Sequence, residues 1–147
     1  MRIEFNNLYT HFVFTTLHRT PLISETYRDR IEKYITGIVK YNGCKLYAIY
    51  ANPEHVHFLV SRSPILSESA LATIVAESSQ RFINNNKLCT TFFAWQEPTA
   101  AFSVSKSDVN KVCSYILQQP EHHRKVPFAE EYDKLLHYYQ KTLHIPS

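Results

Sequence analysis

The sequence has few cysteines and no long apolar run, and these absences exclude several classes of protein. Its three cysteines, Cys44, Cys89 and Cys113, are odd in number, widely spaced and form no Cys-x-x-Cys pair. This argues against a disulfide framework and a zinc ribbon, and it suits a reducing cytoplasm. No apolar run approaches the roughly 18 residues of a membrane span, and residues 1–7 lack the apolar segment of a signal peptide. We therefore expect a soluble cytoplasmic protein with no membrane partner.

Length and composition favour one globular domain. A chain of 147 residues is long enough for one well-packed domain and too short for two ordinary ones, so we expect a single domain over residues 1–147. An apolar fraction of 44% and an aromatic fraction of 14% indicate a compact core. The formal charge of +3 permits an anionic partner without requiring one.

The first part of the chain is expected to form a strand, a helix and a hairpin. Leu8–Thr16 is rich in aromatic and β-branched residues on both faces, which is typical of an interior strand. A helix follows, with Ser24 as its N-cap and Gly43 as its stop. Cys44–Ala51 and His55–Arg62 flank a short Asn-Pro-Glu turn, so these two strands should pair as a hairpin.

The next part adds a helix and a further strand. Apolar residues at helical spacing predict a helix from about Ser69 to Asn84–Asn86, and Thr90–Trp95 has the composition of a fourth strand. The resulting order, β-α-β-β-α-β, predicts an α+β fold of the ferredoxin-like type. In this fold two helices cover one face of an antiparallel sheet.

The tail extends beyond what that fold needs. Phe102–Val104 is short and extended, and Ser105 with Asp108 should open a helix that runs to Gln119 and is terminated by Pro120. A last helix is expected to carry Phe128, Tyr132, Leu135, Leu136 and Tyr139.

Two histidines separated by one residue are the first candidates for chemistry. On a strand, His55 and His57 would project from the same face, because side chains alternate between faces. Neutral imidazole is a common metal ligand, so the pair could hold a divalent cation. A His-x-His sequence also occurs by chance, and the metal site needs support from elsewhere in the chain.

Tyr115 and Gln119 are four residues apart on the predicted tail helix, so they should lie one above the other. Taken alone, they are more simply a core tyrosine and a solvated glutamine. Their combination with the histidine pair is more specific. Other motifs accompany it in order along the chain: His11–Thr16, Arg19, Pro21–Ile23, Glu54–Val60, Ser78–Ser79, Phe93–Gln96, Ala101–Ser105 and Tyr115–Lys125.

This set of motifs resembles the single-tyrosine HUH transposases of small bacterial insertion sequences, including the REP-associated tyrosine transposases. The resemblance implies that His55 and His57 hold a divalent cation, with Gln119 as the third ligand. It implies that Tyr115 attacks a DNA phosphodiester and leaves a 5′-phosphotyrosine and a free 3′-hydroxyl. The ligand types alone would also suit zinc, whereas the family implies Mg²⁺ or Mn²⁺.

The resemblance also implies partners. We expect a homodimer in which each active site combines the histidines of one subunit with the tyrosine helix of the other. We also expect recognition of single-stranded DNA hairpins near the ends of the element. Glu54 could orient a histidine or could simply be a turn residue. Several basic side chains could contact phosphates, with surface solvation as the ordinary alternative: Arg19, Arg62, Arg81, Lys87, Arg124 and Lys125.

The sequence thus predicts a DNA transposase that cuts and rejoins single strands through Tyr115. One alternative is a domesticated relative that nicks or binds repeat hairpins without moving an element. Another is a non-catalytic module that reads single-stranded nucleic acid by aromatic stacking. A phosphodiesterase for small nucleotides fits less well, because it would not need a helical tyrosine beside the metal.

Overall fold

The computed structural model describes residues 1–121 and 126–141. The chain divides into two compact units, Met1–Leu117 and Gln118–Ser147. The first contains a sheet and three α-helices, and the second contains the helix α5 (Phe128–Lys141). The last helix expected from the sequence is therefore confirmed, and the prediction of a single domain over residues 1–147 stays a prediction.

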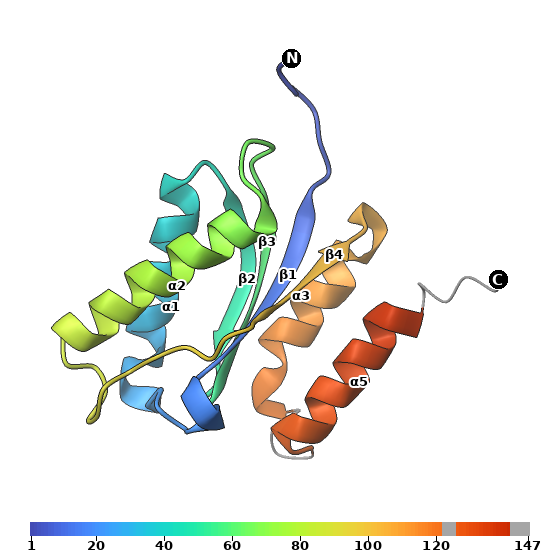
Figure 1. The fold of residues 1–147 in the computed structure, drawn as a ribbon. Coiled ribbons are helices and arrows are strands. Elements are labelled where there is room, and N and C mark those ends of the chain that lie inside the picture. Colours follow the sequence, from blue (N-terminus) through green and yellow to red (C-terminus); the bar gives the residue numbers. More distant parts are fainter. Residues whose placement is uncertain (122–125, 142–147) are drawn as a thin grey trace. The chain divides into compact units, whose positions relative to one another are not determined.

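The first unit is built on a four-stranded antiparallel sheet of order β2-β3-β1-β4 (Figure 1). The strands are β1 (Tyr9–Thr15), β2 (Lys45–Ala51), β3 (His55–Ser61) and β4 (Ala100–Val104). With the helices α1 (Glu25–Tyr41) and α2 (Glu68–Asn85) between them, they follow the ferredoxin-like order. The predicted fold class is confirmed.

Helices α1 and α2 pack on one face of this sheet, and α3 (Val109–Leu117) lies on the other (Figure 1). The core lies on the α1 and α2 side, where the alternation of side chains along each strand directs the even-numbered residues of β1 and β3. Its fully buried members include Phe12, Phe14, Val56, Phe58, Ile31, Ile35, Leu71 and Val75. The odd-numbered residues of β1 and β3 therefore face α3.

The position predicted for the fourth strand was wrong. It is β4 at Ala100–Val104, whereas Thr90–Trp95 contributes only an isolated bridge between Trp95 and Thr16. Phe93 is fully buried, but α2 satisfies its peptide groups: Asn84 Nδ2 donates to the Phe93 carbonyl at 2.9 Å, and the Phe93 amide donates to Asn84 Oδ1 at 2.8 Å. The segment is apolar because it closes the core, and a side-chain amide takes the place of a neighbouring strand.

Apart from the tail helix, the other expected elements are confirmed with shifts of one or two residues at their ends. The tail helix was expected from Ser105 and begins as α3 at Val109, after a 3-10 turn at Lys106–Asp108. The N-cap of α1 is Ser24, and Gly43 follows its C-cap with φ +74°, a left-handed conformation that glycine adopts without strain. The β2–β3 hairpin closes where the Asn52 amide donates to the His55 carbonyl at 2.8 Å. None of the helices in residues 1–121 and 126–141 has the length and apolar composition needed to cross a bilayer.

Candidate active site

His55 and His57 lie next to each other on the face of the sheet that α3 covers. Their ring centroids are 4.9 Å apart with the planes at 79°, and both side chains are buried. The register is fixed from the neighbouring strand, because Thr15 and Val13 of β1 lie opposite them. Since β3 is paired on both sides, the two imidazoles are held by a strand whose position is fully determined.

His55 has a polar partner at each ring nitrogen. Its Nδ1 lies 2.8 Å from Glu54 Oε1, and its Nε2 lies 3.2 Å from Asn52 Nδ2. An ionised carboxylate only accepts hydrogen bonds, so Nδ1 carries the proton and Nε2 is the nitrogen with the electron pair. Glu54 therefore contacts the histidine as one of its two expected roles requires. Nε2 is the nitrogen suited to a metal, which would replace the hydrogen bond that the Asn52 amide donates.

The Glu54 backbone is also fixed. Its carbonyl accepts the Thr16 amide at 2.9 Å and the Thr16 hydroxyl at 3.1 Å. Thr16 directly follows β1 and is fully buried. The turn that carries Glu54 is thus anchored to the strand beside it, which holds the carboxylate in place against His55.

His11 of β1 is a third histidine on this face. Its Nε2 lies 3.0 Å from Nδ1 of His57, and the two ring centroids are 5.2 Å apart. His11 belongs to one of the sequence motifs, but no role was predicted for it. The signal that could have found it is the register: Val13 lies opposite His57, so the side chain two residues earlier on β1 is the diagonal neighbour on the same face.

Tyr115 on α3 faces the same histidines. Its ring centroid is 5.6 Å from that of His57 and 6.5 Å from that of His11, with edge-to-face geometry in both pairs. Val112 and Ile116 of α3 are buried, and Tyr115 lies on the same side of the helix as Val112, because residues three apart share a helix face. The structure thus brings the expected nucleophile and the histidine pair together within the first unit.

Gln119 is not on the same continuous helix as Tyr115, and that expectation was wrong. Helix α3 ends at Leu117, Gln118 forms a turn, and residues 119–121 are again helical. Pro120 accounts for the break, because its ring would clash with the carbonyl four residues earlier and it has no amide hydrogen to donate. Within the second unit, Gln119 Nε2 donates to Glu131 Oε1 of α5 at 2.9 Å.

The basic residues expected to contact DNA differ in their surroundings. Arg62 is held by its own chain, since its guanidinium donates to the Leu66 carbonyl and pairs with Glu68 at 2.8 Å. Arg19, Arg81 and Lys87 are exposed. Arg124 and Lys125 lie outside the described residues. Phosphate contacts by any of these residues stay a prediction, and Arg62 would have to give up partners to make them.

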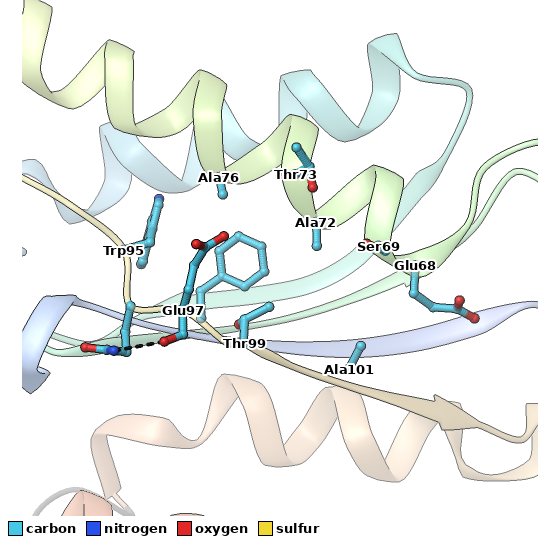
Figure 2. A pocket seen from close by; sticks show the side chains of 11 residues that line it. Glu68, Ser69, Ala72, Thr73, Ala76, Trp95, Glu97, Thr99 and Ala101 are labelled. Atoms are coloured by element: carbon cyan, nitrogen blue, oxygen red, sulfur yellow. Dashed lines mark hydrogen bonds between the residues drawn. The ribbon is translucent and has the colours of Figure 1, made fainter.

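A separate pocket of about 440 Å³ lies on the opposite, α2 side of the sheet (Figure 2). Small residues of α2 form one wall, and Trp95, Thr99 and Ala101 form the other. The carboxylates of Glu68 and Glu97 line it as well, which makes it unfavourable for a phosphate. None of the residues expected to take part in catalysis lines this pocket.

Comparisons with known proteins identify the family and agree with the fold. The family model described as "Transposase IS200 like" matches residues 4–119. A candidate transposase from Deinococcus radiodurans has a similar structure, with a TM-score of 0.58 and 21% identity over 81% of this chain and 95% of that one. A REP-associated tyrosine transposase solved with a REP hairpin gives a TM-score of 0.61 and 17% identity over 86% and 74%. No curated protein matches. The family match spans most of the chain, and the chain therefore belongs to the IS200-like transposase family.

Proposed function

We propose that this transposase cuts and rejoins single-stranded DNA through Tyr115 with the help of a divalent cation. The main support is the position of the Tyr115 ring against His57, with centroids 5.6 Å apart. A tyrosine that only packed the core would not need two histidines as neighbours. A transposase, in contrast, needs a nucleophile next to the group that holds the scissile phosphate.

The residues present fit a divalent cation. His55 and His57 are buried imidazoles on one rigid strand, and Glu54 leaves Nε2 of His55 as the nitrogen that can act as a ligand. These two histidines would hold the ion, and the amide oxygen of Gln119 would complete the set. When bound, Mg²⁺ or Mn²⁺ would withdraw charge from the scissile phosphate and stabilise the departing 3′-oxygen.

Tyr115 would perform the covalent step. A phenol with a pKa near about 10 is a weak nucleophile at neutral pH, so the hydroxyl must lose its proton as it attacks. The Tyr115 oxygen would form a bond to phosphorus, the bond from phosphorus to the 3′-oxygen would break, and that oxygen would take up a proton. The 5′-phosphotyrosine conserves the phosphodiester, so a 3′-hydroxyl can later reverse the step without ATP.

The DNA substrate and the assembly form part of the proposal. The similar REP-associated transposase was solved with a REP hairpin, and this supports a hairpin-bearing single strand as the substrate. Of the basic residues expected to contact DNA, Arg19, Arg81 and Lys87 are exposed, which suits phosphate contacts. The family resemblance further leads us to propose a homodimer, which the molar mass measured by light scattering would test.

The experiment uses labelled single-stranded oligonucleotides carrying hairpins from the DNA that flanks the gene. Each is incubated with the protein, with and without Mg²⁺ or Mn²⁺, and run on a denaturing gel. We expect a covalent adduct that requires metal and disappears in Tyr115→Phe and in His57→Ala. Tyr41→Phe is the matched control, because Tyr41 is 90% exposed at the end of α1 and its loss should leave the adduct unchanged.

Other outcomes would identify the alternatives. Tight hairpin binding without any adduct would indicate a non-catalytic binding protein and refute the cleavage chemistry. An adduct that persists in Tyr115→Phe would assign the nucleophile to another residue. Nicking of dispersed repeat hairpins, without rejoining of element ends, would indicate the domesticated relative.

A further inference from the structure

We propose that His11 is a positioning residue that fixes the tautomer and the ring orientation of His57. This inference rests on the proposed function, because it concerns how His57 is prepared to act as a ligand. The observation behind it is the distance of 3.0 Å between His11 Nε2 and His57 Nδ1, which joins two buried imidazoles on adjacent strands.

The sheet places His11 beside His57, one of the two predicted ligands. On β1, Thr15 lies opposite His55, Val13 opposite His57 and His11 opposite Leu59. His11 is therefore two residues along β1 from Val13, the residue opposite His57, and it points to the same face. Its ring reaches Nδ1 of His57 along that face. The Glu54 carboxylate contacts Nδ1 of His55 in the same way. Each histidine of the pair thus has its own partner at Nδ1.

The chemistry of this contact decides which nitrogen of His57 is available for a metal. A neutral imidazole has one N–H donor and one acceptor nitrogen. If His57 Nδ1 donates to His11, then Nε2 of His57 is the unprotonated nitrogen and can act as a ligand. If the proton lies on His11 Nε2 instead, Nε2 of His57 carries a hydrogen and cannot. We assign the first arrangement, which also matches the state that Glu54 imposes on His55.

The surroundings of His11 restrict its ring. Its side chain is fully buried, and it lies edge-to-face against Phe102 of β4 at 6.3 Å and against Tyr115 at 6.5 Å. A ring held between these aromatic neighbours has little freedom to turn, so it can keep His57 in one orientation. A partner that orients a ligating histidine in this way typically accounts for about 10- to 100-fold in metal affinity.

The experiment measures Mn²⁺ affinity in solution, from the electron paramagnetic resonance signal of the unbound ion, and needs no DNA. His11→Gln places an acceptor oxygen at the same side-chain position as Nε2, whereas His11→Asn is one bond shorter. We expect His11→Asn to weaken Mn²⁺ binding about 10- to 100-fold and His11→Gln to stay close to the wild type. Phe92→Leu is the control, because the Phe92 side chain is 72% exposed, and it should also bind normally.

Equal weakening by Gln and Asn would overturn the proposal, and so would normal binding by both. A second measurement is independent of metal. In the metal-free, ¹⁵N-labelled wild type, two-bond couplings in the NMR spectrum should identify the Nδ1–H tautomer of His57, and a predominant Nε2–H tautomer would refute the assignment. If the wild type bound no Mn²⁺ yet showed the Nδ1–H tautomer, the proposed metal function would fail while the role of His11 stood.

Discussion

Replacing Asn84 by alanine should destabilise the first unit more than its half-buried position suggests. Its side-chain amide makes two hydrogen bonds to Phe93, at 2.9 and 2.8 Å, and both are lost together. Two such bonds contribute about 2 kcal/mol, rising to about 4 kcal/mol if both peptide groups stay out of water. The higher helix propensity of alanine offsets about 0.5 kcal/mol of this. We therefore expect a net loss of about 1.5 to 3.5 kcal/mol in the free energy of unfolding.

The assay is urea unfolding followed by tryptophan fluorescence, which is well placed because Trp95, the single tryptophan, follows Phe93 closely. Asn86→Ala is the matched control. The Asn86 amide also donates to a backbone carbonyl, that of Phe82, but this contact is exposed, so its loss should cost no more than about 0.5 kcal/mol. An equal effect of the two substitutions, or a loss below about 1 kcal/mol for Asn84→Ala, would refute the reasoning.

Three further predictions concern other polar contacts. Glu54→Gln replaces the carboxylate at His55 Nδ1 by a neutral acceptor and should weaken Mn²⁺ binding at least about 10-fold in calorimetric titration; unchanged affinity would make Glu54 a turn residue only. Ser79→Ala removes the acceptor of the Trp95 indole N–H, 3.0 Å away in a buried position, and should cost about 1–3 kcal/mol in chemical unfolding, so a neutral result would contradict it. Burial raises the pKa of Glu32 above its ordinary value of 4.5. A raised pKa in the folded state contributes stability below the unfolded pKa and loses it as pH rises through the folded value. The wild type should therefore be most stable relative to Glu32→Gln in acid, with the advantage shrinking as the pH rises above the ordinary pKa of 4.5 in urea titrations; a difference that does not change with pH would show that the shift is absent.

The strands and helices that depend on local patterns were predictable from the sequence. The β2–β3 hairpin follows from two β-rich runs and a short turn between them, and α1 follows from apolar spacing between Ser24 and Gly43. The neighbouring positions of His55 and His57 follow from the period of a strand alone. These features needed no knowledge of long-range contacts.

The features that were missed depend on contacts between distant parts of the chain. Thr90–Trp95 has the composition of a strand, and the two hydrogen bonds between Phe93 and the Asn84 side chain show why it is not one. The contact of His11 with His57 joins residues 46 positions apart, so it required the register of β1 against β3. The break before Gln119 was the exception, because Pro120 could have indicated it locally.

The seven-residue strand β1 restricts which mutations this protein can accept. The odd positions of β1 face the histidine site, where His11 contacts His57, and its even positions include Phe12 and Phe14 in the core. A one-residue insertion or deletion within the strand would exchange the two faces, placing an imidazole in the core and a phenyl ring beside the histidines. Folding and activity would then fail together, so such length changes cannot yield a stable but inactive descendant. Loss of activity with the fold retained is expected instead from substitutions, for example at the histidines or at Tyr115.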